Sequence, residues 1–182
     1  MLLDISNMGD TGLSFEESLR LTAVASEAPD LVEAPEVRLK GTVSPGPSLR
    51  NPAEGAGLTG EIDGTLRMRC SRCLESVDVP CRASFRFILV AEIPEQNKSE
   101  DAAESERAQF FEIQDGRLAL DAVAAEQVYL EMPLKPLCEK SCAGLCPTCG
   151  INRNRLECAC RHEDVDPRLA VLQEIRDRMS ES

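Results

Sequence analysis

The sequence predicts an α+β fold, in which a β-rich antiparallel sheet or partly open barrel is joined by a cysteine-rich region and a C-terminal helix. Two observations predict it. Apolar and polar residues alternate with period two over several segments of the first half, which is typical of half-buried strands. Eight of the nine cysteines occur as close pairs, and six of these lie between residues 138 and 160. The 182 residues are enough to bury one core.

The N-terminal third predicts strands separated by turns. The expected elements are a strand at 1–6, a strand at 13–21, an acidic, proline-containing connection at 23–35 and a strand at 37–43. Ser14 and Glu17 have the spacing of a helix capping box, which offers a helix as the alternative at 13–21. We favour the strand there because the apolar residues recur at every second position.

The middle of the chain predicts a long antiparallel hairpin. Residues 44–57 are rich in Pro and Gly and predict a loop, and residues 58–68 then alternate between apolar and polar side chains. Alternation resumes at 77–91, after the C-x2-C pair formed by Cys70 and Cys73. Two alternating segments on either side of a short turn indicate a hairpin with this cysteine pair at its tip.

The second half predicts fewer strands and two helices. The expected elements are an acidic loop near 92–109, a strand at 110–113 with a turn at 114–116, a helix near 121–131 with Asp121 as its N-cap, and a terminal helix at 166–179. We accordingly expect a β-rich domain over 1–133. Residues 134–182 form the cysteine-rich segment and terminal helix, packed on the same domain.

Composition restricts the location and the partners. The chain has no apolar run long enough to span a membrane and no basic-then-apolar leader, so we expect a cytoplasmic protein without a membrane partner. Thiols stay reduced in the cytosol, which favours metal binding over disulfides for clustered cysteines. The sequence therefore predicts structural zinc, as one or two ions in a zinc-knuckle region. The expected ligands are Cys70, Cys73, Cys138, Cys142, Cys146, Cys149, Cys158 and Cys160.

Two groupings of these eight thiols are open. In the first, Cys146 and Cys149 join Cys158 and Cys160, and the hairpin pair joins Cys138 and Cys142. In the second, Cys138 and Cys142 join the last pair, and Cys146 and Cys149 reach the hairpin. We prefer the first grouping because the helix that ends at Pro133 must pack on the sheet and keeps Cys138 near it. Cys81 is expected to be a buried strand residue, and His162 is a weaker candidate ligand.

The charge distribution is uneven. The net charge is −12, yet the segments 67–86 and 135–161 carry 10 basic and 4 acidic residues, whereas the other 135 residues carry 10 and 28. Basic residues beside the cysteines are candidates for contacts with RNA phosphates. They are Arg67, Arg69, Arg72, Lys135, Lys140, Arg153, Arg155 and Arg161. The alternative is that they are strand-surface residues paired with local carboxylates.

Catalytic motifs are not evident in the sequence. It contains one His, no G-x-S-x-G motif and no phosphate-binding loop, and a zinc ion with four thiolates has no open position for water. A redox role for Cys70 and Cys73 is disfavoured, since redox C-x2-C pairs usually begin a helix. We expect no enzyme and no small-molecule substrate.

Four motifs carry a family resemblance. They are C-S-R-C-L at 70–74, M-P-L-K-P-L-C at 132–138, C-x-G-L-C-P-x-C-G-x-N at 142–152 and D-P-R-L-A-x-L at 166–172. The sequence, over about 35–178, resembles the YceD-type large ribosomal RNA subunit accumulation proteins of bacteria and plastids. The resemblance implies a non-enzymatic role in synthesis, processing or accumulation of 23S ribosomal RNA, with ribosomal RNA or a pre-50S particle as partner. The alternative is a zinc-stabilised adaptor that binds a basic protein, such as a ribosomal protein.

Overall fold

Two compact units make up the chain. The computed structural model describes residues 1–6, 8–9, 11–46, 55–92 and 110–160. Residues 1–71 and 75–138 form one unit, which we call the sheet unit, and residues 72–74 and 139–182 form the other, which we call the cysteine unit. Most of the predicted acidic loop and the whole predicted terminal helix lie outside the described residues.

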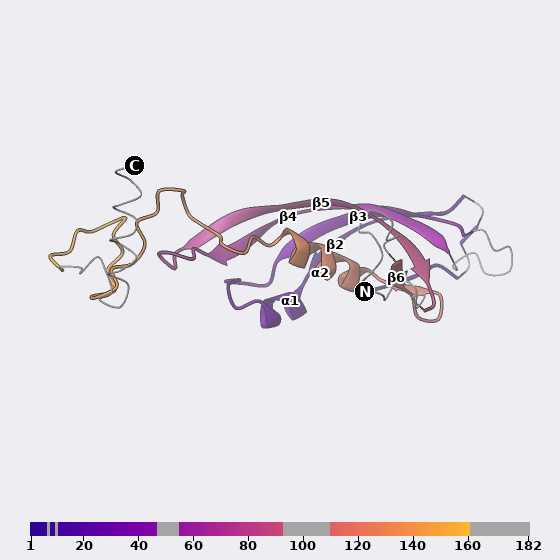
Figure 1. The fold of residues 1–182 in the computed structure, drawn as a ribbon. Coiled ribbons are helices and arrows are strands. Elements are labelled where there is room, and N and C mark those ends of the chain that lie inside the picture. Colours follow the sequence, from indigo (N-terminus) through magenta and orange to yellow (C-terminus); the bar gives the residue numbers. More distant parts are fainter. Residues whose placement is uncertain (7, 10, 47–54, 93–109, 161–182) are drawn as a thin grey trace, which may run out of the picture. The chain divides into compact units, whose positions relative to one another are not determined.

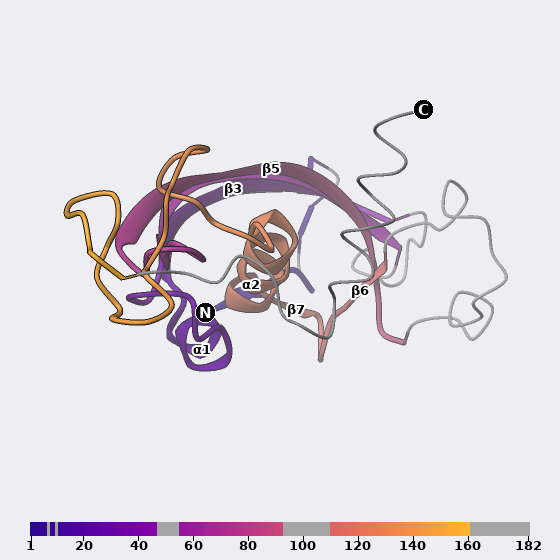
Figure 2. The same cartoon turned by 60° about the vertical axis from the view of Figure 1, so that its left-hand side comes forward.

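One five-stranded sheet dominates the sheet unit, in the order β2-β3-β4-β5-β6. Its strands are β2 (Leu13–Arg20), β3 (Glu36–Ser44), β4 (Ala56–Arg69), β5 (Ser76–Val90) and β6 (Phe110–Glu112). The first four pair antiparallel, and only the short β6 runs parallel to its neighbour β5. The sheet is curled into a half-barrel (Figure 2). The prediction of an antiparallel sheet or partly open barrel is confirmed, as is the strand at the start of the sheet.

The hairpin of β4 and β5 is the longest element of the sheet. Its register runs from Ala56 opposite Leu89 to Arg69 opposite Ser76, so the two strands pair over the full length of β4. The apolar positions of β4, such as Leu58 and Ile62, are buried, while the intervening polar positions are exposed. The period-two pattern of the sequence therefore reports the two faces of this hairpin correctly.

Helix α2 (Leu120–Glu131) covers the concave face of the sheet, and the strands arch over it (Figures 1 and 2). Val123, Ala124 and Val128 on this helix are fully buried and belong to the same apolar cluster as the inward side chains of β3, β4 and β5. Burial of an aliphatic side chain stabilises the fold by about 1.5–3 kcal/mol. The core of the sheet unit is therefore formed between α2 and the concave face.

A second, two-stranded sheet joins the N-terminus to the start of α2. β1 (Leu2–Asp4) pairs antiparallel with β7 (Arg117–Ala119), a strand that was not predicted from the sequence. The turn before β7 contains Asp115 and Gly116, both with positive φ, which Gly and Asp tolerate better than most residues. The turn at this position was predicted.

Two of the predicted details are wrong. The connection at 23–35 begins inside a helix, α1 (Thr22–Glu27), whose buried Val24 packs into the core. Asp121 is not the N-cap of α2, because the helix begins one residue earlier and Ala119 occupies the cap position without a side-chain bond. Asp121 instead lies in the first turn, and its carboxylate is 3.1 Å from the amino group of Met1. None of the helices in the described part of the chain has the length and apolar content that a membrane span requires.

Candidate metal centres

Four cysteine sulfurs gather at the end of the β4–β5 hairpin. Those of Cys70, Cys73, Cys138 and Cys142 all lie within 4.8 Å of one another, and three of the four residues are buried. A tetrahedral zinc ion with Zn–S bonds of about 2.3 Å separates its sulfurs by about 3.8 Å. Four sulfurs at this spacing therefore fit one tetrahedral ion after small adjustments.

Backbone hydrogen bonds hold the hairpin end in place. The N–H of Cys70 donates to the carbonyl of Glu75 at 2.8 Å, which closes the turn after β4. The N–H of Ser71 donates to the carbonyl of Pro136, also at 2.8 Å, so the segment after α2 lies against the end of β4. Cys138 follows two residues later, which explains how a cysteine so distant in sequence reaches Cys70.

The second group lies wholly within the cysteine unit and contains Cys146, Cys149, Cys158 and Cys160. Their sulfurs also lie within 4.8 Å of one another. The N–H of Gly150 donates to the carbonyl of Cys146 at 2.8 Å, and the N–H of Cys149 points at the Cys146 sulfur at 3.4 Å. Gly150 has φ +74°, a conformation that this tight turn needs and glycine adopts without strain. This turn is the knuckle that the spacing C-P-x-C-G predicted.

The acidities of the second group show that its four thiols do not all ionise readily by themselves. Backbone N–H groups, first that of Cys149 and then that of Thr148, lower the pKa of Cys146 to about 6. The neighbouring sulfur of Cys149, with burial and Cys146, raises the pKa of Cys160 from 9.0 to about 12. Four adjacent thiolates repel one another, so they require a cation. The chemistry of the donor set fits a thiophilic divalent ion such as zinc.

The structure brings the eight cysteines together in the first of the two predicted groupings. Metal ligation by these residues stays a prediction, because the grouping concerns only the positions of the sulfurs. Cys81 stands apart from both groups and is fully buried in β5, as a strand residue of the core. His162 and Arg161 lie outside the described residues.

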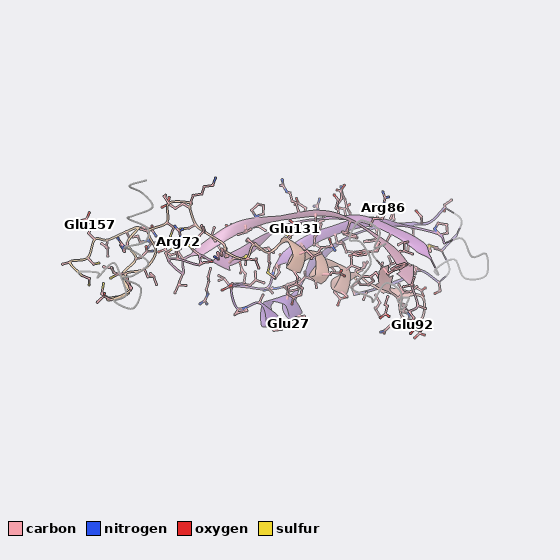
Figure 3. The ribbon with its side chains drawn as sticks, in the orientation of Figure 1. Glu27, Arg72, Arg86, Glu92, Glu131 and Glu157 are labelled. Carbon is pink, nitrogen blue, oxygen red and sulfur yellow. The ribbon has the colours of Figure 1, made fainter. Side chains whose placement is uncertain are left out.

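A polar network joins the loop at 152–155 to Cys142 within the cysteine unit. The side-chain oxygen of Asn154 accepts the N–H of Ala143 at 2.7 Å. Its amide nitrogen donates to the Cys142 sulfur at 3.2 Å and to the side-chain oxygen of Asn152 at 2.9 Å. On the other side, the Arg72 guanidinium donates to the carbonyl of Cys142 at 2.9 Å. The labelled Arg72 and Glu157 can be located in Figure 3.

All seven described residues of the predicted RNA-binding set are exposed, but they have different surroundings. They are Arg67, Arg69, Arg72, Lys135, Lys140, Arg153 and Arg155. Arg67 forms ion pairs with Glu33 at 3.5 Å and Asp78 at 3.4 Å. Arg72 donates to a backbone carbonyl, that of Cys142. For these two residues, the alternative of a local structural role has direct support.

The asparagines of the cysteine unit were missed as candidate site residues. Asn152 and Asn154 enclose Arg153 in the segment between Cys149 and Cys158, and only the basic residue was predicted to have a role. Two amide side chains inside a short cysteine-bounded loop were the available signal. Their partners, the Cys142 sulfur and the Ala143 N–H, become apparent only in the folded unit.

A curled antiparallel sheet followed by two four-sulfur groups defines a small β-rich protein with sites of the structural-metal type. The model of one protein family matches residues 58–176, and that family is described as "Large ribosomal RNA subunit accumulation protein YceD". The chain therefore belongs to the YceD family. The match includes the β4–β5 hairpin, α2 and all eight clustered cysteines.

Two relatives illustrate the range of similarity. The uncharacterized protein Rv2926c of Mycobacterium tuberculosis is 31% identical over 123 residues, which are 68% of this chain and 56% of that protein. A protein of Arabidopsis thaliana, "Large ribosomal RNA subunit accumulation protein YCED homolog 1, chloroplastic", is 23% identical over 145 residues, 68% of this chain and 45% of that protein. The chain thus spans about half the length of the curated relatives it matches. No solved structure matches it.

Proposed function

We propose that this chain is a non-enzymatic factor that supports the accumulation of 23S ribosomal RNA by binding RNA or a pre-50S particle in the cytoplasm. The observation that carries the proposal is the family match over residues 58–176. The name of the Arabidopsis relative supports the same direction. The two sulfur groups would serve as structural zinc sites that hold the cysteine unit folded.

The proposed RNA contact depends on exposed cations that are not neutralised by a neighbouring carboxylate. In the described part of the chain, Arg69, Lys135, Lys140 and Arg153 are exposed and show no ion pair within 4.0 Å. Such cations can replace the counterions of RNA phosphates. These four residues are therefore better candidates for phosphate contacts than Arg67, which already has two acidic partners.

Charge reversal tests the RNA contact. Arg69→Glu combined with Arg153→Glu should weaken binding of 23S ribosomal RNA fragments and reduce the salt dependence of that binding, by about 0.7–0.9 in slope for each phosphate that is no longer neutralised. The matched control is Arg20→Glu with Arg38→Glu, which changes the same charge at residues paired with Glu36 and Glu16 on the sheet. Equal effects of the two double variants would contradict a specific contact surface.

Zinc content must accompany this assay. A zinc ion with four thiolates carries a net charge of −2, so nearby cations such as Arg153 also stabilise the metal electrostatically. A variant that loses RNA binding and keeps its zinc supports the contact. Purified, reduced protein with less than one equivalent of zinc would contradict the structural-metal part of the proposal.

One observation favours a second function, a protein-interaction adaptor for a basic partner. The net charge of the whole chain is −12, and the arginines and lysine of β2, β3 and β5 that form ion pairs are neutralised by neighbouring carboxylates. An acidic protein attracts basic proteins such as those of the ribosome. Binding of isolated ribosomal proteins without any binding of RNA would favour this alternative.

A further inference from the structure

We propose that Asn154 is a positioning residue that couples the two four-sulfur groups, so that a metal ion in the Cys146 group raises the affinity of the Cys70 group for its own ion. The inference rests on the proposed metal binding and goes beyond it. Asn154 lies in the segment between Cys149 and Cys158, two residues of the second group, and its side chain contacts Cys142 of the first.

The hydrogen bonds of Asn154 fix the orientation of its amide. Its oxygen faces the N–H of Ala143, which can only donate, and its nitrogen faces the Cys142 sulfur and the Asn152 side-chain oxygen, which both accept. The reverse orientation would place donor against donor and acceptor against acceptor. Both ends of this amide are thus engaged, and one N–H points at a candidate ligand.

An N–H group directed at a metal-bound sulfur stabilises the negative charge on that thiolate and holds the sulfur in position. Loss of such a partner typically lowers metal affinity by roughly 10- to 100-fold. Asn154 can supply this bond only while its loop keeps its shape. Within that loop, the N–H of Arg153 donates to Gly144 at 2.9 Å, and the N–H of Arg155 donates to Asn152 at 3.1 Å.

A metal ion in the second group would close the chain between Cys149 and Cys158 and so restrain the loop that carries Asn154. The restrained side chain then meets Cys142 without a further loss of conformational freedom. By thermodynamic linkage, an ion in the first group raises the affinity of the second by the same factor. Arg72 supports the other side of Cys142 through its carbonyl, which makes Asn154 the contact that depends on the second group.

A double-mutant cycle tests the coupling, with the reduced full chain titrated with Co²⁺, whose thiolate complexes absorb strongly. The affinity of the first group is measured with the second group intact and with it disabled by Cys146→Ser and Cys149→Ser. In the unchanged chain we expect the affinity to fall by roughly 10- to 100-fold when the second group is disabled. In Asn154→Ala, we expect the first group to bind weakly in both backgrounds, so that the ratio approaches one.

Two further readouts separate positioning from a general loosening of the loop. Loss of the N–H bond leaves the sulfur more electron-rich, so the sulfur-to-cobalt absorption band should move to longer wavelength in Asn154→Ala. Leu156→Ala is the control, since Leu156 lies in the same loop with a side chain that is 60% exposed. It should keep the band and the coupling.

Each outcome is decisive. Two equivalents of metal with the same coupling ratio in the unchanged chain and in Asn154→Ala would overturn the role of Asn154 and leave the metal sites intact. Less than one equivalent in the unchanged chain would overturn the metal sites and the coupling together. An unshifted absorption band without coupling would show that Asn154 acts on the loop and not on the Cys142 sulfur, which also contradicts the proposal.

Discussion

Gly60 on β4 lies directly opposite Phe85 on β5, and the Phe85 ring occupies the space that a side chain at residue 60 would need. A Cβ added at Gly60 would lie 2.5 Å from the ring atom Cζ and 2.9 Å from the carbonyl oxygen of Lys40. Phe85 is buried and also contacts the ring of Phe87, with centroids 5.4 Å apart. The glycine therefore allows the aromatic ring to lie close against the sheet inside the core.

Gly60→Ala should destabilise the sheet unit by about 1–3 kcal/mol, the usual cost of overpacking a core. The control is Gly57→Ala in the same strand, where an added Cβ meets no atom within 4 Å. Urea denaturation of the two variants measures the difference. Equal midpoints for Gly60→Ala and Gly57→Ala would contradict the close packing of Phe85 on Gly60.

The cysteine unit offers a similar pair of glycines. Gly144 and Gly150 both have positive φ, so alanine at either position strains the backbone by about 1–2 kcal/mol. Only at Gly144 would the new Cβ also crowd another segment, at 3.1 Å from the carbonyl oxygen of Arg72. That oxygen accepts the N–H of Leu145 at 3.0 Å. Gly144→Ala should therefore lose zinc to a competing chelator more readily than Gly150→Ala, and the reverse order would count against this contact.

Cys81 should give the folded state a specific dependence on pH. Burial, with smaller contributions from Glu131 and Asp63, raises the pKa of this thiol from 9.0 to about 11. Between these values the unfolded chain releases the proton and the folded chain keeps it. The unfolded state then binds fewer protons, so the free energy of unfolding falls as the pH rises from 9 to 11, and Cys81 contributes no pH dependence below 9.

Cys81→Ala isolates this contribution, because the other titrating groups are shared by both proteins. The difference in unfolding free energy between the two proteins should be constant up to about pH 9 and should then shrink or reverse toward pH 11. Urea denaturation at several pH values measures it. A difference that stays constant over this whole range would show that the folded protein accommodates the Cys81 thiolate.

Removal of metal should affect the two units unequally. The folding free energy of the cysteine unit would come largely from ligand binding, whereas β4 and β5 are stabilised by their paired backbones and buried side chains. After chelation, we expect hydrogen exchange to accelerate at the amides of Cys146, Gly150 and Arg153, which donate within the loop. Exchange at the centre of β4 should change little. An equal acceleration in both regions would contradict the local role of the metal.

The sequence by itself determined the features that depend on local periodicity and local spacing. Alternation along 58–68 and 77–91 predicted β4 and β5 with the correct buried faces, because a strand exposes every second side chain to the same environment. The C-P-x-C-G spacing at Cys146 and Cys149 predicted a tight turn around two thiols. Such patterns need no knowledge of distant residues.

Only the tertiary structure decided the features that depend on distant partners. β1 and β7 are three residues each, too short to show a period, and they exist because they pair with each other. Arg67 looked like a free cation until folding placed Glu33 and Asp78 beside it. Asn154 likewise acquires a role only through the Cys142 sulfur. The energies of ion pairs and hydrogen bonds depend on distances in space, which spacing along the chain does not specify.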